Sequence, residues 1–513
     1  MYTRLYSGAI TGVEAQLVEA QCDVAGGLPA FQMVGLPDKE VSESRERIRS
    51  ALKNAGYSFP ARRITANLAP ADVRKAGVGF DLPVALSILV ASGQIDAVKD
   101  DLLFTGELGL DGSVRPVRGV LALSSLAGTS NLRGVVVPEE NGDEAALVGS
   151  LPVYPVSSLR DAASILAGTK DVVPHTVDAE AYLAARQAGS PRVDLEEIRG
   201  QFKAKRALEI AAAGGHNVLM CGPPGAGKSL LARSLADILP PLSLEEALET
   251  TRLYSIAGRL EPGRPLMVKR PFRAPHQTIS YAGMVGGGHG VPGPGEISLA
   301  HHGVLFLDEL PEFDRSVLET LRQPLEDRTV LISRAGISVR YPASFSLVCA
   351  MNPCPCGFLG DTLQNCTCSF RDVQRYRRRL SGPLLDRVDL FVDVPRLSSD
   401  ELFGERRSEP TAAVRARVQA ARQVQWDRGK SADRAWDNAH LESADLDRHC
   451  ALDAQATTLL QRAVSRFALS ARAHVRVLRV ARTIADLAGS DRLRVEHVAE
   501  AIQYRASRDL LGE

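Results

Sequence analysis

Runs of apolar residues divide the first third of the chain into predicted strands and helices. A short alternating run at 63–68 predicts a strand, and the long apolar run at 82–92 predicts a buried helix. Farther along, two short runs flank Asp111-Gly112, a pair that suits the tight turn of a hairpin. A continuous apolar run at 134–138 predicts another buried strand. Residues 1–170 are therefore predicted to form one α/β unit.

The same patterns divide the rest of the chain into three further parts. Polar and small residues with several breakers make 171–193 the predicted linker. Residues 194–394 mix short buried strands with helices and are predicted to form a second α/β domain. From 395 to 513 the pattern is helical, with arginine-rich amphipathic stretches. A chain of 513 residues is too long for one hydrophobic core, and about three domains agree with its length.

Two segments of the second α/β domain differ from its regular elements. The tract 270–296 contains too many glycines and prolines to form one helix or strand. The segment 330–340 alternates between apolar and polar residues around Ala335-Gly336, which predicts a hairpin. We find no internal repeat in the chain.

Composition is typical of an ordinary globular protein. The chain is 45% apolar and 24% charged, which does not favour disorder. Because 61 lysines and arginines balance 61 aspartates and glutamates, the whole molecule has no net field that attracts nucleic acid. Any contact with DNA must then come from a local basic patch or from a pore lined by several subunits.

The sequence carries no signal for a membrane or for export. No apolar run approaches the ~20 residues of a membrane span, and the N-terminus lacks a signal-peptide core. We therefore expect a cytoplasmic protein without membrane contact. In that compartment the eight cysteines are expected to be thiols or metal ligands rather than disulfides.

A phosphate-binding loop lies between a predicted strand and a predicted helix. The strand ends at Cys221 and the helix runs on from Leu230. The residues between them match G-x-x-x-x-G-K-[ST], in which backbone N–H groups converge on phosphates, the lysine adds positive charge and the hydroxyl is a ligand for Mg²⁺. A chance glycine turn would not explain both flanking elements. We predict an ATP site formed by Gly222, Pro223, Pro224, Gly225, Ala226, Gly227, Lys228 and Ser229.

Polar residues end two further predicted strands. Asp308 and Glu309 follow one of them, and Asn352 follows the other. We predict that Asp308 holds Mg²⁺ with Ser229 and that Glu309 activates the attacking water. Asn352 is predicted to contact the γ-phosphate and that water. The alternatives are an acidic surface turn and an asparagine that serves the turn before Pro353.

Two arginines are candidates for the positive charge that phosphoryl transfer requires. Arg387 is the candidate for an arginine finger supplied to a neighbouring subunit, and its alternative is a salt bridge with Asp386 or Asp389. Arg472 opens a predicted C-terminal helix and is the candidate to reach the γ-phosphate from the lid. Arg476, one turn later, is its rival.

Four clustered cysteines form two C-x-C pairs, at Cys354 and Cys356 and at Cys366 and Cys368. Four thiolates would complete a tetrahedral zinc site, although this spacing is tighter than the usual C-x₂-C. The alternative is a loop shaped by free thiols. The sequence therefore leaves both a zinc site and a loop of free thiols open.

A basic run follows the cysteines, and a histidine pair precedes the acidic pair. Such a run is typical of a solvated helix face or a contact between subunits, with nucleic-acid binding as a third possibility. No metal partner for the histidines is evident from the sequence. The residues are Arg375, Arg377, Arg378 and Arg379 with Tyr376, and His301 with His302.

Together with 273–276 and 292–301, these motifs resemble the magnesium-chelatase-like AAA+ ATPases of the ComM/YifB type. The resemblance covers nearly the whole chain. It implies an AAA+ domain with hairpin insertions, a helical lid, ATP and Mg²⁺ as ligands, and a homo-oligomer, expected to be a hexameric ring. It also implies an ATPase that acts on single-stranded or branched DNA as a branch-migration helicase. In the family the hairpins face the pore, so Lys269, Arg270 and Arg334 are candidates for phosphate contacts.

The N-terminal unit resembles the proteolytic domain of Lon proteases, which is related to a ribosomal S5 fold. Gly79 stands where that family has its nucleophilic serine, and Arg118-Gly119-Val120 is followed by Leu121 where it has its lysine. A hydroxyl nucleophile needs an adjacent base. The resemblance therefore implies a domain of this fold without peptidase activity.

Two other functions remain open at this point. One is a chelatase-type ATPase that drives metal insertion into a tetrapyrrole with partner subunits, although the chain shows no large integrin-like domain. The other is a non-enzymatic ring scaffold, which would not need the acidic pair. The sequence departs from the family pattern at Gln277 and at His302, where a histidine and an asparagine are usual.

Overall fold

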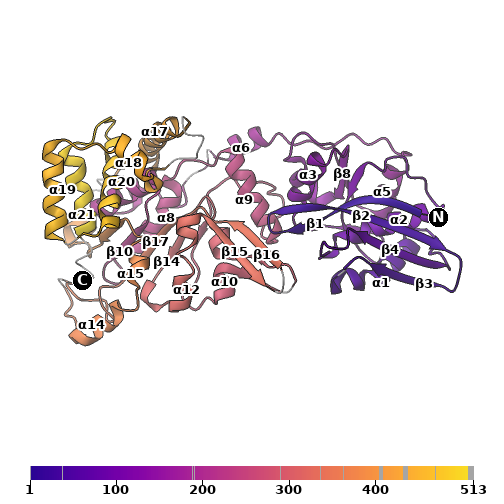
Figure 1. The fold of residues 1–513 in the computed structure, drawn as a ribbon, viewed down its shortest axis with the longest axis horizontal. Coiled ribbons are helices and arrows are strands. Elements are labelled where there is room, and N and C mark those ends of the chain that lie inside the picture. The colour runs from indigo at the N-terminus through magenta and orange to yellow at the C-terminus, as the bar shows by residue number, and fades with distance from the viewer. Residues whose placement is uncertain are drawn as a thin grey trace.

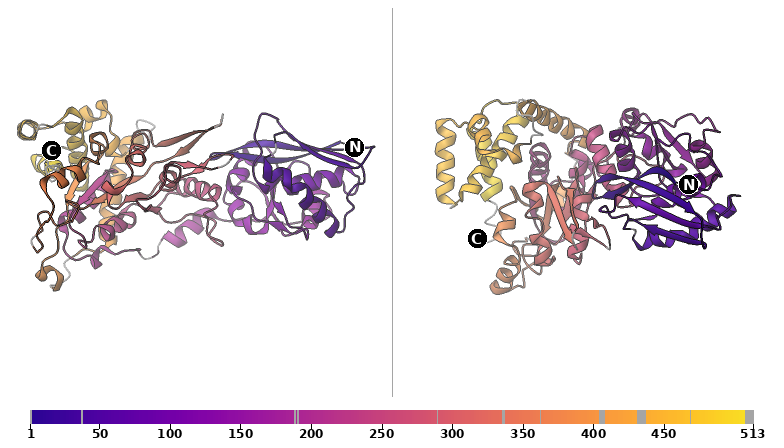
Figure 2. Two further views of the ribbon diagram at one scale, coloured as in Figure 1. Left: turned by 90° about the horizontal axis from the view of Figure 1, so that it is seen from below. Right: turned by 45° about the vertical axis from the view of Figure 1, so that its right-hand side comes forward.

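The computed structural model describes residues 2–36, 38–187, 189, 191–288, 290–334, 337–361, 363–403, 408–430, 437–467 and 469–506. The molecule is elongated, with the N-terminal unit at one end and the C-terminal helices at the other (Figure 1). The sheet that carries the phosphate loop lies between them. Two further views show the same order of parts (Figure 2).

The N-terminal unit is a seven-stranded mixed sheet covered by helices. Its strand order is β3-β4-β2-β1-β5-β8-β9, and the predicted strand, helix, hairpin and buried strand of this unit are confirmed as β4, α2, β6–β7 and β8. The strands are β1 (Tyr2–Thr11), β2 (Glu14–Ala25), β3 (Ala30–Val34), β4 (Arg63–Ala69), β5 (Leu102–Phe104), β6 (Glu107–Leu108), β7 (Val114–Arg115), β8 (Gly134–Pro138) and β9 (Val153–Val156). The helices are α1 (Lys39–Asn54), α2 (Asp81–Ala91), α3 (Val120–Thr129), α4 (Gly142–Ala146) and α5 (Leu159–Leu166).

The central sheet is parallel throughout its described strands. Its order is β11-β14-β17-β10-β18, and the register pairs Val218 with Val348 and Val304 with Ser346. In a parallel sheet all carboxyl ends lie at one edge, so the residues that follow β10, β14 and β17 meet there. The strands are β10 (Val218–Cys221), β11 (Phe272–Arg273), β14 (Val304–Leu307), β17 (Ser346–Met351) and β18 (Leu390–Asp393).

Helices surround this sheet, and two of them adjoin the strand that carries the phosphate loop. The phosphate loop leads into α8, and α7 lies just before β10. The helices are α7 (Phe202–Gly214), α8 (Lys228–Ile238), α9 (Leu244–Ile256), α10 (Tyr281–Val285), α11 (Glu296–Leu299), α12 (Arg315–Glu319), α13 (Pro324–Asp327), α14 (Phe370–Arg377) and α15 (Gly382–Leu385).

The two irregular segments fold as short elements. The glycine- and proline-rich tract contains β11, α10 and the strand pair β12 (Gly286–Gly287) and β13 (Gly293–Pro294), and α11 begins at its last residue. The predicted hairpin is confirmed as β15 (Thr329–Arg334) antiparallel to β16 (Ile337–Pro342). Its expected turn, Ala335-Gly336, lies outside the described residues.

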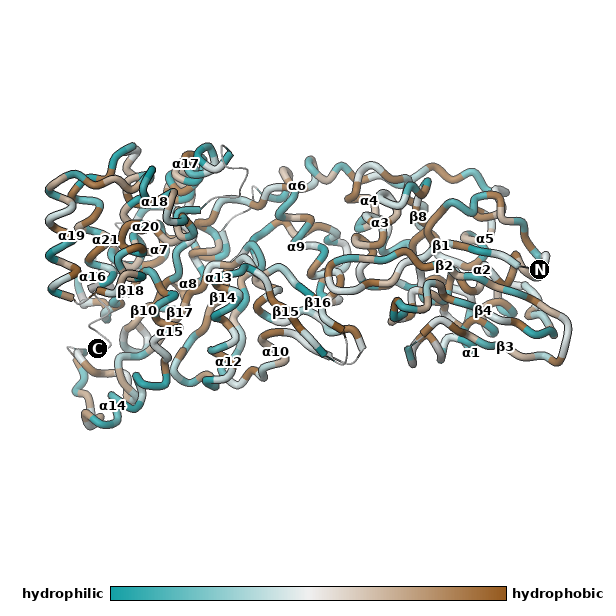
Figure 3. Tube along the Cα trace, in the orientation of Figure 1, coloured by the Kyte–Doolittle hydropathy of each residue, from teal (hydrophilic) through white to brown (hydrophobic). Residues whose placement is uncertain are grey.

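The C-terminal part is helical, as predicted. The helix α17 packs against α7 and α8, and α20 packs against α21 and α7. Apolar segments follow the buried strands and the inner sides of these helices (Figure 3). The helices are α16 (Ser399–Phe403), α17 (Thr411–Lys430), α18 (Ser443–His449), α19 (Ala454–Arg466), α20 (Ala471–Leu487) and α21 (Val495–Ala506).

The predicted linker contains a helix, α6 (Ala179–Gln187), whose Leu183 packs in a cluster with Ala247 of α9. The N-terminal unit also contacts α9 directly, since the backbone N–H of Gly119 donates to Ser255 Oγ at 2.8 Å. The domain boundaries themselves remain predictions. Among the described helices, none has the length and apolar character to cross a membrane.

Candidate active site

The loop between β10 and α8 has the backbone that its glycines predict. Gly225 and Gly227 have φ angles of 78° and 88°, in the left-handed region that favours glycine. Gly222 lies against the chain after β18, and a Cβ added to it would approach the carbonyl oxygen of Val394 to 2.1 Å. Side chains at these positions would therefore distort the loop or the strand end beside it.

Lys228 is the centre of the hydrogen bonds within this loop. Its Nζ donates to the carbonyl oxygens of Gly222 and Pro223, at 2.5 and 2.9 Å, and to Asn352 Oδ1 at 3.1 Å. Burial lowers the pKa of Lys228. The predicted lysine and the predicted sensing residue are thus in contact, although 124 positions separate them.

The predicted magnesium ligands also meet. Ser229 Oγ donates to Asp308 Oδ2 at 2.8 Å, across the gap between α8 and the end of β14. Glu309 is exposed and has a left-handed φ of 51°. Its backbone N–H donates to Asp308 Oδ1 at 3.0 Å. The two neighbouring carboxylates therefore lie apart: Asp308 contacts Ser229, and Glu309 is exposed to solvent.

These residues fit a nucleotide triphosphate with its metal ion. Ser229 and Asp308 would hold Mg²⁺, which neutralises phosphate charge when bound. The left-handed glycines turn the loop so that its N–H groups and the start of α8 form an anion-binding end. Lys228 adds a cation beside them. The structure thus brings together the loop residues, Asp308 and Asn352, with Glu309 next to them in the chain.

Gln201 is a contact of the phosphate loop that sequence patterns do not reveal. Its Nε2 donates to the carbonyl oxygens of Ala226, at 3.3 Å, and Pro395, at 2.7 Å. The residue is buried and has a φ of 54° at the start of α7. It ties the loop to the chain that leaves β18. No spacing rule links position 201 to the loop, so only the fold identifies it.

Arg387 lies inside its own subunit. The side chain is 10% exposed and forms an ion pair with Glu326 at 2.5 Å. It also donates to the carbonyl oxygens of Arg322 and Pro383, at 3.1 and 2.7 Å. The partner is therefore neither Asp386 nor Asp389. A role as a finger for the next subunit stays a prediction and requires this arginine to leave Glu326.

The lid helix α20 packs at the sheet edge opposite the phosphate loop. Arg476 forms an ion pair with Asp389 just before β18, and Thr483 hydrogen-bonds His216 just before β10. Arg472, one turn before Arg476, is exposed. Within one subunit it therefore lies on the side away from the loop. Contact between Arg472 and a phosphate stays a prediction, for a neighbouring subunit.

The four clustered cysteines converge, and their sulfurs all lie within 4.8 Å of one another. The Sγ atoms of Cys354, Cys356 and Cys366 are 3.4 to 3.6 Å apart, and the backbone N–H of Cys356 donates to Cys368 Sγ at 3.3 Å. Four thiolates about 2.3 Å from one zinc ion would be separated by about 3.8 Å. The set therefore fits a tetrahedral metal.

The cysteine knuckle, defined as the described residues of 354–368, rests on the phosphate loop. Gly357 has a φ of 89°, and a Cβ added to it would lie 2.6 Å from Pro224 Cδ and 3.9 Å from Asn352 Cγ. The knuckle thus contacts two parts of the candidate site.

Comparisons with known proteins support this assignment. Three family models match in chain order: subunit ChlI of Mg-chelatase at 18–141, magnesium chelatase subunit ChlI at 194–402, and the ChlI C-terminal model at 408–505. Competence protein ComM of Haemophilus influenzae is 44% identical over 509 residues, which cover 99% of this chain and 98% of ComM. Protein YifB of Escherichia coli is 42% identical over 513 residues, covering 99% and 97%. The chain belongs to the magnesium-chelatase-like ComM/YifB family.

As a ComM/YifB-family protein, the chain is a magnesium-chelatase-like ATPase of the ComM type. The family implies ATP and Mg²⁺, which agrees with the residues that meet around the loop. The similarity to a magnesium-chelatase subunit itself covers a smaller part of the chain. The magnesium-chelatase 67 kDa subunit of Chlorobaculum parvum is 31% identical over 163 residues, which cover 31% of this chain and 23% of that subunit.

His302, one of the departures from the ComM/YifB pattern, belongs to a hydrogen-bonded group with His301 and Glu249. Glu249 Oε2 lies 3.2 Å from His301 Nε2 and 2.7 Å from His302 Nε2. His301 Nδ1 accepts from the backbone N–H of Ser344 at 3.0 Å, so its proton is on Nε2 and faces Glu249. A metal would have to displace that proton. Glu249 comes from α9, and no sequence pattern indicated it.

The basic candidates for DNA differ in their surroundings. Arg334 is exposed on the hairpin. Arg270 instead pairs with Glu246 at 2.9 Å and donates to the carbonyl oxygen of His302 at 2.7 Å. Its side chain is 12% exposed. Arg270 therefore holds the amino edge of the central sheet together and is a poor candidate for phosphates, whereas Arg334 keeps that role as a prediction.

Proposed function

We propose that this protein is a subunit of a hexameric AAA+ ring that uses ATP hydrolysis to move DNA. The proposed activity is that of a branch-migration helicase in homologous recombination or transformation. The observation that carries the proposal is the joining of three strands at one site, through the contacts of Lys228 with Asn352 and of Ser229 with Asp308. Likeness along the whole chain to a competence protein supports DNA as the substrate.

Each residue of the site has a distinct part in the proposed reaction. The phosphate loop and Lys228 bind and orient the β- and γ-phosphates. Glu309 accepts a proton from the attacking water, and Asn352 positions that water or the γ-phosphate. Lys228 can exchange its bond to Asn352 for a phosphate, so nucleotide binding is expected to release this asparagine for catalysis.

The hairpin β15–β16 supports the contact with DNA. Arg334 and Arg340 are exposed on its two strands and lie on opposite faces of the hairpin, because Arg334 shares the face of the buried Ile332 and Val339 whereas Arg340 pairs with the exposed Leu331. Arginines on a hairpin contact phosphates without reading bases, so binding is expected to be independent of sequence and to weaken with salt.

The decisive experiment measures ATP hydrolysis with and without single-stranded, forked and four-way DNA. We expect stimulation by at least one of these DNAs and loss of all hydrolysis in Lys228→Ala. Absence of both DNA stimulation and DNA binding at low salt would reject a DNA motor. Hydrolysis by Lys228→Ala at the wild-type rate would reject the site.

An alternative is a chelatase-type ATPase that drives metal insertion with partner subunits, which the local likeness to a chelatase subunit supports. The two functions separate cleanly in one assay. ATP-dependent insertion of magnesium into a porphyrin by this chain with its partners, without any response to DNA, would favour the alternative.

We also propose that the cysteine knuckle binds zinc. The mutual approach of four sulfurs supports it, and the free-thiol interpretation predicts a metal-free protein. Metal analysis of protein purified without added zinc is expected to give about one equivalent per chain, and less than about half would reject the site. The Lon-like N-terminal unit is proposed to lack peptidase activity, so peptide cleavage that survives Lys228→Ala would contradict its assignment.

A further inference from the structure

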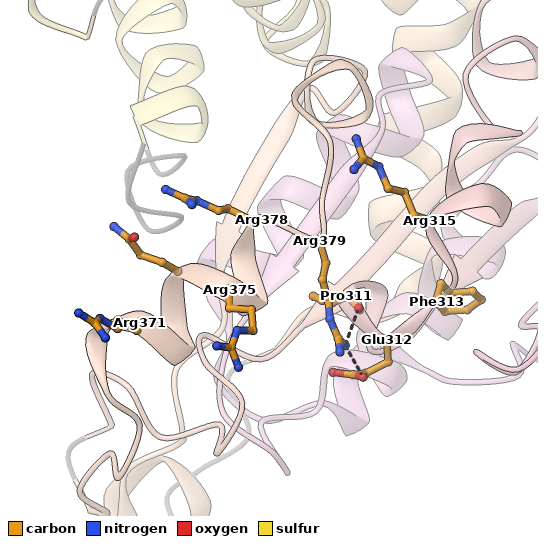
Figure 4. Close-up of a pocket in the computed structure, with 9 residues that line it drawn as sticks. Pro311, Glu312, Phe313, Arg315, Arg371, Arg375, Arg378 and Arg379 are labelled. Atoms are coloured by element: carbon orange, nitrogen blue, oxygen red, sulfur yellow. Dashed lines mark hydrogen bonds and ion pairs between the residues drawn. The ribbon is translucent and has the colours of Figure 1, made fainter.

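A pocket lined by arginines lies beside the candidate active site. It has a volume of about 700 Å³ and is formed by α14 on one side and the turn after β14 on the other. Figure 4 shows Arg371, Arg375 and Arg378 reaching out from the α14 side and Arg315 across from them. The lining residues are Pro311, Glu312, Phe313, Arg315, Arg371, Gln374, Arg375, Arg378 and Arg379.

Carboxylates offset the positive charge of this pocket only in part, with Asp372 near Arg375 and Glu319 near Arg315. Glu312 is its only acidic lining residue, and it is already paired with Arg379 at 2.7 Å. Within the part of the chain that the structure describes, Arg315, Arg371, Arg375 and Arg378 form no ion pair. All four are exposed. Several arginines that form no ion pair and line one pocket make a site for an anion with several charges.

The helix α14 presents these arginines in a row. Its inner side is fixed by the buried side chains of Val373 and Tyr376. Arg371, Arg375 and Arg378 then follow at intervals of four and three residues, which places them on one face. They extend over about 10 Å of helix axis. That length exceeds one phosphate group and suits several phosphates in succession.

An exposed aromatic ring lies at the start of the same helix. Phe370 is 75% exposed. It precedes by one turn Gln374, which lines the pocket. A ring beside a row of arginines is the combination with which proteins hold a single strand, because bases stack on the ring while phosphates contact the cations. A free polyphosphate would gain nothing from the ring.

The pocket is also placed to act on catalysis. Its lining includes Pro311 and Glu312, which come two and three residues after Glu309. Its helix begins just after the cysteine knuckle, and Arg377 donates to the carbonyl oxygen of Pro353 at 3.4 Å. An anion bound here would therefore contact the segment that follows Glu309, and it would contact α14, whose Arg377 bonds the residue after Asn352.

We infer that this arginine pocket is a second DNA site, which binds the sugar-phosphate backbone of a single strand away from the hairpin β15–β16. The inference rests on the proposed function, because it assumes that the protein acts on DNA. It gives a role to the basic run, which belongs neither to the hairpin nor to the ATP site. Strand binding at the pocket is expected to stimulate ATP hydrolysis through the segment after Glu309.

The test compares two double variants with the same spacing and the same charge change. Arg371→Gln with Arg375→Gln removes two arginines from the pocket. Arg462→Gln with Arg466→Gln removes two exposed arginines from α19, four residues apart in the same way. Binding of a labelled single-stranded oligonucleotide to the full chain is measured by fluorescence anisotropy over a series of salt concentrations.

We expect the pocket variant to lose affinity by about tenfold or more at low salt, and its slope of log K against log salt to fall by about 1.4, for two lost contacts. The α19 variant is expected to stay within about twofold, and both should keep basal hydrolysis without DNA. Phe370→Ala should weaken binding of single strands more than binding of duplexes.

Equal DNA affinity and slope in the pocket variant and wild type would overturn the inference while leaving the DNA motor intact. A wild type that binds no DNA would instead reject the proposed function. To separate sources of phosphate, inorganic triphosphate is titrated into protein whose ATP site is saturated with a non-hydrolysable analogue. Triphosphate binding lost in the pocket variant, with DNA binding unchanged, would assign the pocket to free polyphosphate and overturn the DNA inference.

Discussion

At the scale of residues, the ATP site depends on a few side chains whose partners are far away in sequence. Lys228 contacts Asn352, and Ser229 contacts Asp308. The motifs predicted which residues belong to the site and at which sheet edge they lie. They did not predict that Lys228 binds Asn352 directly, nor that Gln201 fastens the loop, because these contacts depend on how separate strands are aligned.

Glu309→Gln is expected to keep ATP binding and to lower the hydrolysis rate by about 10²–10⁴-fold, because an amide cannot take a proton from water. Nucleotide affinity and single-turnover hydrolysis measure the two effects separately. Glu319→Gln, a change of the same kind on α12, serves as the control and should hydrolyse normally. Wild-type turnover in Glu309→Gln would remove this residue from the catalytic role.

Asp389 gives a residue-scale prediction about pH. Burial opposes its ionisation, but Arg476, His216 and the backbone N–H of Asn217 outweigh burial and hold the pKa of Asp389 well below its usual range. A carboxylate with a lowered pKa contributes stability above the unfolded-state pKa of about 3.9, and that contribution is lost as the pH falls toward the folded-state value.

Asp389→Asn is therefore expected to lower the free energy of unfolding by about 2–4 kcal/mol at pH 7, since Arg476 loses its partner. The difference from wild type should shrink below about pH 4. Urea unfolding at several pH values measures both, with the exposed Asp327→Asn as the control. A difference that stays constant with pH, or none at all, would contradict the assigned ion pair.

At the scale of elements, local patterns predicted much of what is seen. The apolar runs gave β4, β8, β10, β14 and β17, and Asp111-Gly112 gave the hairpin β6–β7. The helices α17 and α20 follow their amphipathic stretches. The linker differs, because it contains α6, whose apolar residues are too few to show a period but pack against α9 in the fold.

Such patterns did not predict the contacts between elements. A lid helix was expected near the γ-phosphate, yet α20 packs at the opposite sheet edge in its own subunit. Arg387 pairs with Glu326, which lies 61 positions away. Spacing reports which face of an element is apolar, and it does not report which neighbour covers that face.

The cysteine knuckle offers an element-scale test with a built-in control. Gly357 and Gly360 both have left-handed φ angles, 89° and 80°. An added Cβ meets Pro224 at 2.6 Å in the first case and nothing within 4 Å in the second. Gly357→Ala and Gly360→Ala therefore share a backbone cost of about 1 kcal/mol, and only Gly357→Ala presses on the phosphate loop.

We expect Gly357→Ala to raise the KM for ATP by about tenfold or more, and Gly360→Ala to change it by less than about threefold. Steady-state kinetics at several ATP concentrations measure the difference. Equal KM values for the two variants would show that the knuckle does not act on the loop. Removal of the proposed zinc ion by a strong chelator is expected to resemble Gly357→Ala.

At the scale of the whole molecule, the phosphate loop is half of a proposed shared site. The N-terminal unit contacts α9 of the ATPase domain, and a Cβ on Gly12 of its first hairpin would approach Val339 of β16 to 2.7 Å. The N-terminal unit therefore touches the predicted DNA hairpin directly. If the hairpin moves during ATP turnover, the N-terminal unit is expected to move with it.

Mixed subunits test whether Arg387 acts on a neighbour. Arg387→Ala and Lys228→Ala should each be inactive, and an equal mixture should recover up to about one quarter of wild-type hydrolysis in a closed ring. The ion pair with Glu326 offers the competing account. If Arg387 only stabilises its own subunit, the mixture stays inactive and Glu326→Gln lowers thermal stability as much as Arg387→Ala does.

The most direct measurement of the whole account follows strand exchange on a labelled four-way junction with ATP. We predict that wild-type protein converts the junction into two duplexes with ATP, and that it does not do so with a non-hydrolysable analogue. Lys228→Ala and Glu309→Gln should leave the junction intact even where they bind it. Conversion without ATP hydrolysis, or wild-type protein that hydrolyses ATP and binds the junction without ever converting it, would contradict a DNA motor driven from this site.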